Sequence, residues 1–440
     1  MELPKEVKNA IGRLESAGYE AFAVGGCVRD SLLGNEPGDY DLTTAAKPEE
    51  TKRVFQGEKI IETGIKHGTV TVILGETSLE ITTFRVDSEY RDNRRPERVE
   101  FTKSIEEDLA RRDFTMNALA YSESRGIVDP FGGEADVKAG IIRAVGDPEK
   151  RFREDALRIM RALRFASALG FEIEPETEKA LFENRALLLN VSAERLSEEL
   201  LKLLCGQNVR WVLMKYTDVL GVILPELLPM RGLDQRNPHH IYDVLEHSAA
   251  AAEKVPPRPA LRLGALLHDV GKPRCFTLDE NGVGHFYGHP EISAQMAEEI
   301  LSRLRLDSAA KKEVVSLVKY HGAQIEPTAK SVRRALNKYS PELFFELLLL
   351  KRADAAACDP GRPLDEEYFS ALESLAGEII AEKQCFSLKD LAVKGDDLVA
   401  AGFAPGPKLG AALGLLLDKV INGELPNERE KLLDFAKTLL

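Results

Sequence analysis

Runs of apolar and β-branched residues alternate with helical stretches at the start of the chain, and the pattern then becomes almost wholly helical. Ala21 to Val24, Gly68 to Leu74 and Ser78 to Phe84 predict strands, because each run is apolar or β-branched and is bounded by glycine or polar residues. Asp147 and Pro148 predict a helix start, with an N-cap carboxylate followed by proline at the first helical position. The pattern therefore predicts a mixed α/β region followed by helical ones.

Breaker residues divide the helical part. Asn237-Pro238 ends a first helical run, and Pro405-Gly406-Pro407 precedes a final pair of helices. Between them, the segment from Phe276 to Phe286 carries an Asn281-Gly282 turn and predicts a small hairpin. In the tail, four leucines at helical spacing predict a packed face: Leu409, Leu413, Leu416 and Leu417. We expect four domains, over residues 1–145, 146–236, 237–380 and 381–440.

Composition and charge narrow the class of protein. The chain has 440 residues, 44% hydrophobic and 30% charged, which is typical of a soluble globular protein. It shows neither a signal peptide nor an apolar run long enough to span a membrane, and its five cysteines form no C-x-x-C pair, so we expect a cytoplasmic protein. The net charge of −13 argues against non-specific coating of nucleic acid, but residues 143–164 carry seven basic and four acidic groups, so RNA binding would be local.

Two short motifs near the start suit a nucleotide triphosphate. Gly25 and Gly26 follow a predicted strand and precede a helix, so that backbone N–H groups and the helix N-terminus can hold phosphate, with Arg29 one turn further on. Asp39 and Asp41 lie two residues apart, which on a strand places both carboxylates on one face, where Mg²⁺ would relieve their repulsion. Either motif alone is also explained by a structural turn or a solvated strand edge, but their close succession favours a phosphate and metal site.

Four segments in order carry a family resemblance: GGCVRDSLLG, DYDLTT, RRDFTMNALAY and EDALRIMRALRFASALGF. They resemble the nucleotidyltransferase superfamily of DNA polymerase β type and, within it, the class II tRNA nucleotidyltransferases and bacterial poly(A) polymerases. The resemblance implies an α+β fold, with a small mixed-sheet head followed by an all-helical, RNA-binding neck and body, a second helical domain and a helical tail. It implies template-independent addition of CCA to the tRNA 3′ end from CTP and ATP, with release of pyrophosphate, and no binding of DNA or membranes. Asp39 and Asp41 would hold Mg²⁺ and be catalytic.

The third motif would supply the nucleotide pocket. The resemblance implies that Arg112 contacts the nucleotide and that Asp113 and Asn117 shape its sugar pocket. We expect this motif to open a helix, with Arg111 an exposed surface residue at its capped end.

The fourth motif would select the base. On a helix continuing from Pro148, Asp155, Arg158, Arg161 and Arg164 would step by three around one half. The opposite half would bury Phe152, Ala156, Ile159, Met160 and Leu163. A carboxylate only accepts and a guanidinium only donates, so Asp155 and Arg158 can pair with cytosine or adenine and reject uracil and guanine. The resemblance implies this role, with Arg161 and Arg164 lining the groove toward phosphate or RNA. The alternative is a solvated face with a weak Asp155–Arg158 ion pair.

The polar segment between Phe84 and Phe101 helps to predict which nucleotides are added to the tRNA. Its five arginines and five acidic residues are typical of a mobile loop. The resemblance implies that relatives completing CCA carry a comparable loop and that those adding only CC lack one. The loop therefore favours full CCA addition or A addition alone, and we expect full CCA addition. An A-adding enzyme and a poly(A) polymerase remain alternatives, as does a phosphohydrolase whose head only binds RNA.

The second helical block holds seven of the eight histidines. Six positions, each on a predicted helix or at its end, have the order of metal ligands in the HD phosphohydrolase superfamily: His247, His268, Asp269, His289, His321 and Asp354. The resemblance implies a transition metal (Mn, Fe, Ni or Zn) and a possible second, phosphohydrolase activity, with Lys272 contacting phosphate. The other histidines, His67, His239, His240 and His285, are interpreted as structural.

Overall fold

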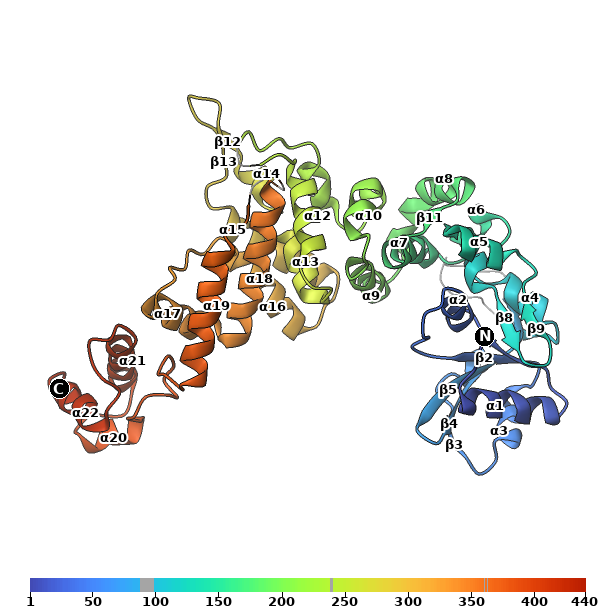
Figure 1. Cartoon of the computed structure of the whole chain (residues 1–440), viewed down its shortest axis with the longest axis horizontal. Coiled ribbons are helices and arrows are strands. Elements are labelled where there is room, and N and C mark those ends of the chain that lie inside the picture. Colours follow the sequence, from blue (N-terminus) through green and yellow to red (C-terminus); the bar gives the residue numbers. More distant parts are fainter. Residues whose placement is uncertain (88–98, 238–239, 360, 362) are drawn as a thin grey trace. The chain divides into compact units, whose positions relative to one another are not determined.

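The computed structural model describes residues 1–87, 99–237, 240–359, 361 and 363–440 (Figure 1). The chain divides into two compact units. The first comprises Met1–Leu228 with Arg303–Arg305, and the second comprises Pro229–Ser302 with Leu306–Leu440. The finer division into four domains stays a prediction. Within the described ranges, no helix is long and apolar enough to cross a membrane.

A mixed sheet forms the head of the first unit, as predicted. Its seven strands have the order β3-β4-β5-β2-β1-β8-β9, and only β2 and β5 run parallel. The strands are β1 Ala21–Val24, β2 Asp41–Thr44, β3 Lys59–Ile61, β4 Thr69–Leu74, β5 Thr77–Thr83, β8 Ala120–Ser122 and β9 Gly126–Val128. The helices of the head are α1 Lys5–Ser16, α2 Gly26–Leu32, α3 Pro48–Val54, α4 Ile105–Ala110 and α5 Gly133–Ala139, with 3-10 turns η1 Ile65–His67 and η2 Thr115–Asn117. The short strands β6 Arg85–Asp87 and β7 Val99–Phe101 pair beside the sheet, and most of the polar segment between them lies outside the described residues.

Strand pairing decides where the first two motifs meet. All four residues of β1 are buried, and β1 pairs antiparallel with β2, so that Ala23 lies opposite Leu42. The end of β1, where Gly25 follows, therefore lies beside the start of β2, where Asp41 stands. A core that includes Phe22, Phe84 and Leu109 fixes this edge of the sheet.

Helices continue the first unit. They are α6 Pro148–Glu154, α7 Leu157–Leu169, α8 Pro175–Asn184, α9 Ala193–Leu204, α10 Val209–Lys215 and α11 Thr217–Leu220, with 3-10 turns η3 Arg185–Asn190 and η4 Pro225–Met230. Two-residue strands β10 Ile141–Ile142 and β11 Glu172–Ile173 pair in parallel. The predicted Asp147 cap and Pro148 start of α6 are confirmed.

The prediction of one continuous helix after Pro148 is wrong. The helix ends at Glu154, because Asp155 adopts an extended conformation (φ −137°, ψ 102°), and α7 begins at Leu157. The Oδ1 atom of Asp155 accepts a hydrogen bond from the Leu157 N–H at 3.1 Å, so this carboxylate caps the second helix instead of continuing the first. The five predicted apolar positions are nevertheless fully buried.

The prediction that the RRDFTMNALAY motif opens a helix is also wrong. Arg111 is the C-cap of α4, Phe114 is extended and forms a β-bridge with Ala144, and Asn117 ends η2. Ser104 caps α4 earlier in the chain, which brings the motif to the helix end. Arg111 is partly buried, because its guanidinium binds the buried Asp108 carboxylate at 2.8 Å.

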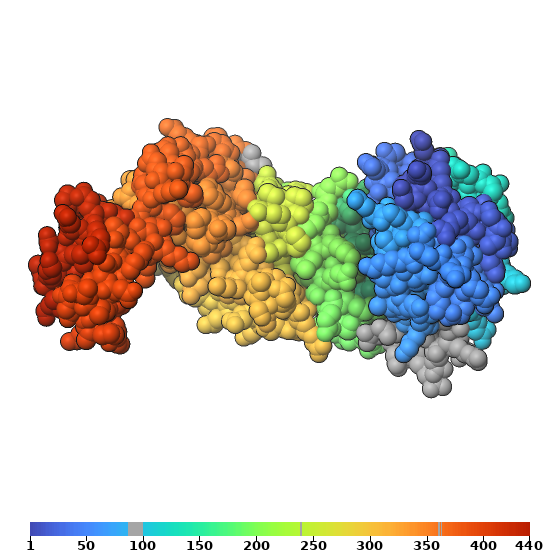
Figure 2. All heavy atoms as spheres, turned by 90° about the horizontal axis from the view of Figure 1, so that it is seen from below, coloured from blue at the N-terminus to red at the C-terminus, as the bar shows by residue number. Residues whose placement is uncertain are grey.

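The second unit is a helical bundle with a helical tail. Its helices are α12 Val244–Lys254, α13 Pro259–Leu267, α14 Lys272–Cys275, α15 His289–Arg303, α16 Ser308–Tyr320, α17 Ala329–Tyr339, α18 Pro341–Cys358, α19 Glu366–Ala381, α20 Gly395–Ala400, α21 Pro407–Ile421 and α22 Arg429–Lys437. The predicted hairpin is confirmed, with β12 Thr277–Leu278 paired to β13 Gly284–His285. Figure 2 shows the tail residues gathered into one lobe, and the predicted leucines of α21 contribute to its core.

Candidate functional site

The Gly-Gly turn of the head brings two arginines together. Gly25 has a φ of +78°, which favours glycine, and a Cβ atom there would lie 3.0 Å from the Nη1 atom of Arg112. The buried Arg29 donates a hydrogen bond from Nη1 to the Oδ1 atom of Asn117 at 2.8 Å. The turn, the start of α2 and two guanidinium groups thus lie together, as an anion site requires.

Three carboxylates gather at the adjacent strand ends. Asp39 precedes β2, and Asp41 begins it and lies opposite Glu80 of the parallel strand β5. Asp41 is accessible to solvent, yet desolvation by the surrounding protein, followed by the charges of Asp39 and Glu80, raises the pKa of its carboxyl. A divalent cation would reverse this effect.

Sequence reasoning missed Glu80. The available signal was the alternation of β5, which places Glu80 between the buried Leu79 and Ile81 and so on the exposed face. Its position opposite Asp41 depends on the parallel pairing of β2 and β5.

A continuous polar chain links the third and fourth motifs. Asn117 donates from Nδ2 to the Oδ1 atom of Asp113 at 3.2 Å, and Arg161 of α7 donates from Nε to Oδ2 of the same carboxylate at 2.7 Å. Burial alone would raise the pKa of Asp113, but Arg161, together with Arg158 and Asn117, outweighs burial and lowers this pKa to about 2. Asp113 therefore stays ionised and holds Asn117 and Arg161 in place.

The arginines of α7 have acidic partners on other elements. The Nε atom of Arg164 lies 2.8 Å from the Oε2 atom of the buried Glu199 in α9, and Arg161 lies 3.8 Å from the other oxygen of that carboxylate. Around the ring of Phe165 lie the guanidinium groups of Arg29, Arg161 and Arg164, at 5.1, 5.5 and 4.1 Å from its centroid. Sequence reasoning compared only neighbours along the helix and so missed Glu199.

Asp155 and Arg158 lie close in the sequence but bind different partners. Arg195 of α9 donates from Nη2 to the Oδ2 atom of Asp155 at 2.9 Å. Arg158 donates to the Oε2 atom of Glu154 at 2.9 Å and to the carbonyl oxygen of Arg111, also at 2.9 Å. The alternative of a solvated helix face predicted an ion pair between Asp155 and Arg158. Instead, Arg195 orients Asp155, and Glu154 and the Arg111 carbonyl orient Arg158.

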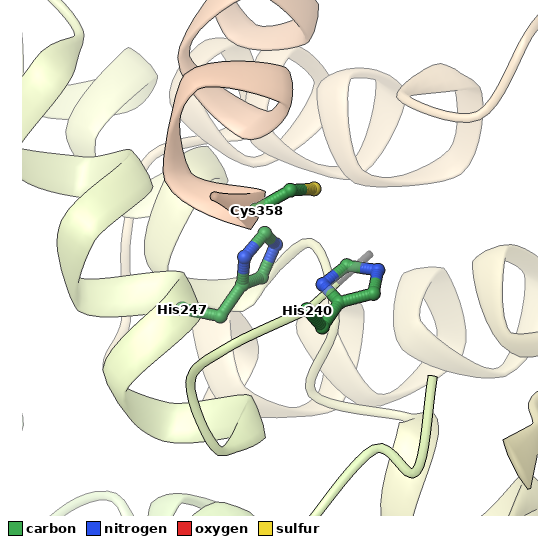
Figure 3. Close-up of side chains that lie close together, drawn as sticks. All are labelled: His240, His247 and Cys358. Carbon is green, nitrogen blue, oxygen red and sulfur yellow. The ribbon is translucent and has the colours of Figure 1, made fainter. Parts of the chain in front are cut away.

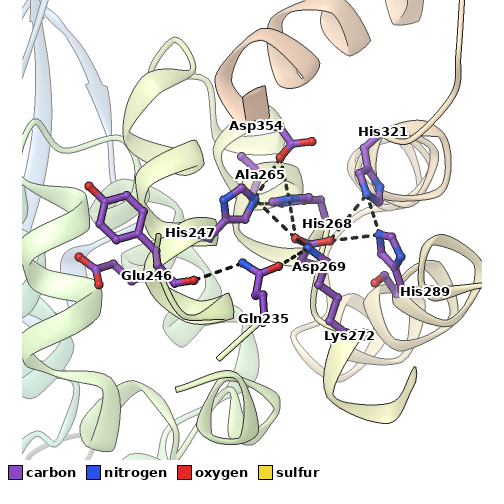
Figure 4. A network of polar contacts seen from close by, with 12 residues as sticks. Gln235, Glu246, His247, Ala265, His268, Asp269, Lys272, His289, His321 and Asp354 are labelled. Carbon is purple, nitrogen blue, oxygen red and sulfur yellow. Dashed lines mark hydrogen bonds and ion pairs between the residues drawn. The ribbon is translucent and has the colours of Figure 1, made fainter. Parts of the chain in front are cut away.

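In the second unit, the six predicted metal ligands converge on one point (Figure 4). His247 comes from α12, His289 from the start of α15 and Asp354 from α18, whereas His268 and His321 follow the last residues of α13 and α16. Asp269 lies between two groups of imidazoles: its Oδ2 atom is 3.5 and 3.2 Å from the Nε2 atoms of His247 and His268, and its Oδ1 atom is 3.3 and 3.7 Å from those of His289 and His321. The Oδ1 atom of Asp354 is 3.0 Å from Nε2 of His247.

The orientation of these imidazoles suits metal binding. His268, His289 and His321 each have Nδ1 within 2.6–2.8 Å of the backbone carbonyl oxygen three residues earlier. A carbonyl only accepts, so Nδ1 carries the proton and Nε2 presents a lone pair to the cluster. Four ligands are almost inaccessible, whereas the side chains of His289 and Asp354 are 21% and 28% exposed and form the open side.

The carboxylates of Asp269 and Asp354 give the cluster a negative charge that a bound cation would neutralise. Burial alone would lower the pKa of His268, but Asp269 and Asp354 raise it to about 10. Lys272 is buried and donates to Oδ2 of Asp269 at 2.6 Å and to the Oε1 atom of Gln235 at 2.8 Å.

The remaining predictions concern histidines. His285 pairs with Asp279 and stacks on Tyr287, outside the six-residue cluster. His240 lies beside His247, with ring centroids 5.1 Å apart. His239 lies outside the described residues.

Protein-family models match three parts of the chain. The poly A polymerase head domain matches residues 21–143, the probable RNA and SrmB-binding site of polymerase A matches residues 170–230, and the putative tRNA nucleotidyltransferase domain 2 matches residues 285–436.

Relatives match along the whole chain. The CCA-adding enzyme of Lactiplantibacillus plantarum is 35% identical over 447 aligned residues, which cover 99% of this chain and 97% of the relative. The CCA-adding enzyme of Geobacillus stearothermophilus is 52% identical over 202 residues, 46% of this chain and 50% of that protein. The crystal structure of the Bacillus stearothermophilus CCA-adding enzyme in complex with CTP matches with a TM-score of 0.75 and 32% identity, covering 100% of this chain and 98% of that one.

Proposed function

Since the chain belongs to the family of the CCA-adding enzymes, we propose that it adds C, C and A to the 3′ end of tRNA from CTP and ATP and releases pyrophosphate. The observation that carries the proposal is the convergence of the Gly-Gly turn, the Asp39 and Asp41 pair and the Asn117–Asp113–Arg161 chain in one unit. A protein that handles tRNA, CTP and ATP would work in the cytoplasm.

The Gly25-Gly26 turn and the two arginines beside it would bind the phosphates. The backbone N–H of Gly26 and the guanidinium groups of Arg29 and Arg112 would bind the triphosphate. Gly25 gives the turn its shape, because its own N–H already donates to the carbonyl oxygen of Leu119 at 3.0 Å. Asn117 and Asp113 would border the sugar, because Arg29 and Arg161 already hold them in one orientation.

Asp39 and Asp41 would hold Mg²⁺, with Glu80 beside them. The family uses a divalent metal, and these carboxylates fit one because desolvation, followed by their mutual repulsion, raises the pKa of Asp41. When bound, Mg²⁺ supplies charge neutralisation of the triphosphate and activation of the RNA 3′-hydroxyl.

Base selection would use Asp155 and Arg158. Asp155 would accept from the exocyclic amine of cytosine or adenine, while Arg195 holds its carboxylate in one orientation. Arg158 donates to the ring nitrogen beside that amine. Uracil and guanine present a carbonyl and an N–H instead, so both contacts would be lost.

The test uses tRNA transcripts that end at the discriminator base, at C and at CC. Each is incubated with Mg²⁺ and with CTP, ATP or both, and products are sized at single-nucleotide resolution. Growth by three, two and one nucleotides, followed by a stop, is expected. Extension of only the CC end would overturn the proposal in favour of an A-adding enzyme, and long tails from ATP alone would favour a poly(A) polymerase.

The cluster of the second unit supports an additional function. We propose that it binds transition-metal ions (Mn, Fe, Ni or Zn) in two ligand sets that share Asp269 and that it hydrolyses a phosphate ester. One set is His247, His268, Asp269 and Asp354, and the other is Asp269, His289 and His321. Ligands that bind one ion at about 2.1 Å lie about 3–3.5 Å apart, which is the spacing found here.

The residues around the ligand sets fit this chemistry. Bound ions of this kind supply a water molecule of lowered pKa. His289 and Asp354 leave the cluster open on one side, and Lys272 is placed to bind a phosphate oxygen once a cation neutralises Asp269.

Metal analysis of the purified protein tests this second function. At least about two equivalents of bound transition metal, and hydrolysis of bis(p-nitrophenyl) phosphate stimulated by Mn²⁺ or Ni²⁺, are expected. Asp354→Asn should lose both properties. A wild-type protein that binds no Mn²⁺ or Ni²⁺ and gains no hydrolysis would refute the proposal without touching CCA addition.

A further inference from the structure

A thiol and a further imidazole lie beside the metal cluster of the second unit. Figure 3 shows His240, from the segment before α12, and Cys358, the last residue of α18, next to His247. The backbone ties the two segments together, because the N–H of Ile241 donates to the carbonyl oxygen of Cys358 at 3.2 Å. The three side chains therefore come from separate elements held in one place.

Their donor atoms are close enough to bind one ion. One ligand atom from each of His240, His247 and Cys358 lies within 4.8 Å of the other two. The rings of His240 and His247 are nearly perpendicular, at 79°. This spacing is looser than that of bound ligands, so binding would draw the three side chains together.

His247 differs from the other imidazoles of the cluster. His268, His289 and His321 each place Nδ1 against a backbone carbonyl. His247 is 0% exposed. Its Nε2 atom faces the Oδ1 atom of Asp354 at 3.0 Å, whereas its Nδ1 atom makes no hydrogen bond within the described part of the chain. The Nδ1 atom of His240 is likewise buried without such a bond among the described residues. Buried nitrogens in this state are what a metal ion would satisfy.

We propose that His240, His247 and Cys358 form a third metal position, which selects a thiophilic cation such as Zn²⁺. Thiolate with imidazole is a softer donor set than the imidazoles and carboxylates of the neighbouring sets, which also accept Mn²⁺. Three protein ligands leave one tetrahedral position for water. Binding deprotonates the Cys358 thiol and releases its proton to solvent.

The shared ligand makes the third position a regulator of the other two. His247 belongs both to this set and to the set with His268 and Asp354. A neutral imidazole has one lone pair, so zinc bound by Cys358 and His247 takes this ligand from the neighbouring ion. This consequence rests on the proposed phosphohydrolase, whereas the third position itself does not.

Cobalt substitution of the full-length protein tests the inference. Co²⁺ bound to a thiolate gives an intense near-ultraviolet charge-transfer absorption, which nitrogen and oxygen ligands do not give. We expect this band in the wild type, its loss in Cys358→Ser, and an affinity for Zn²⁺ at least about tenfold lower in that variant, measured against a chromophoric chelator.

Matched variants show whether the thiolate of Cys358 is the ligand that gives the band. Cys275→Ser is the control, because Cys275 is also a partly buried thiol of the second unit, and it should keep the band. His240→Ala should weaken the band, and Asp354→Asn should keep it while losing Mn²⁺ binding. Retained CCA addition and an unchanged circular dichroism spectrum show that each variant is folded.

The outcomes are distinct. A wild type without the band, or a band that survives in Cys358→Ser, overturns the third position. Absence of Mn²⁺ binding and hydrolysis with an intact band would refute only the proposed phosphohydrolase.

Discussion

The two candidate sites of this chain satisfy their polar groups to different degrees. In the head, hydrogen bonds join Arg29, Asn117, Asp113 and Arg161, the Nε atom of Arg112 makes none among the described residues, and Asp41 is accessible to solvent. In the second unit, imidazole nitrogens and carboxylate oxygens lie within 3.0–3.7 Å of one another, and several of them make no hydrogen bond among the described residues.

This difference would determine when each proposed metal site acquires its ion. In the head, several side chains bind one another while the Asp41 carboxylate is accessible to solvent. Such a site suits an ion that arrives with the triphosphate, as Mg²⁺ does. A buried set of unsatisfied lone pairs is costly unless an ion is resident. We therefore expect the head to exchange its metal at each turnover and the second unit to retain its metal through purification.

The largest effect is expected from a substitution at the candidate site of the head. Asp41→Asn should lower CCA addition by about a thousandfold or more, because the lost metal contact is worth several kcal/mol and each 1.4 kcal/mol is a factor of ten. Single-nucleotide sizing of extended tRNA measures it. Glu76→Gln, in an exposed turn of the same sheet, is the control. Substantial extension by the Asp41 variant would remove this carboxylate from the reaction.

The reciprocal change targets the second unit. Asp269→Asn should release the ions of both ligand sets and reduce phosphate-ester hydrolysis by about a hundredfold, since metal ligands and their supports carry effects of this order. Elemental analysis and a hydrolysis assay with Mn²⁺ measure the loss, and CCA addition should be unchanged. If CCA addition fell in parallel while the protein stayed folded, the two sites would not be independent.

A smaller effect concerns base selection within the head. Arg195→Gln should reduce discrimination of CTP over UTP by about tenfold to a hundredfold, because a hydrogen bond to a charged group is worth about 1.5–3 kcal/mol. Competing incorporation of the two nucleotides into tRNA ending at the discriminator base measures it. Arg153→Gln, on the exposed face of α6, should leave discrimination intact. Equal values for both variants would mean that Arg195 does not orient Asp155.

The smallest effect concerns stability. The pKa of Asp113 is held at about 2, below its ordinary 3.8, so its stabilising contribution is present above about pH 4 and is lost as the pH falls toward 2. Asp113→Asn should therefore lower the free energy of unfolding by about 2 kcal/mol at pH 7, and the difference should shrink in that acidic window. Urea unfolding at several pH values measures it. Glu149→Gln, which breaks an exposed pair with Arg153, should cost less than about 1 kcal/mol at every pH.

Local chemistry in the sequence was enough to predict the main elements. Strands near Ala21, Gly68 and Ser78, the Asp147 cap and the Asn281-Gly282 hairpin follow from apolar patterning and turn chemistry, which act between neighbouring residues. The six cluster residues of the second unit were also predicted, because chemically specialised residues on successive helices share a bundle interior.

Contacts between distant segments were decided only by the tertiary structure. Asp155 ends a helix that its neighbours favour, since its carboxylate caps α7 and binds Arg195. Glu80 reaches Asp41 only through a parallel strand pair, and Glu199 reaches Arg164 only through the packing of α9 on α7. Cys358 lies far along the chain from His247, and no local pattern links them. The sequence determined which chemistry the chain carries, and the packing of its elements determined which of those groups face one another, because burial and strand register act at long range.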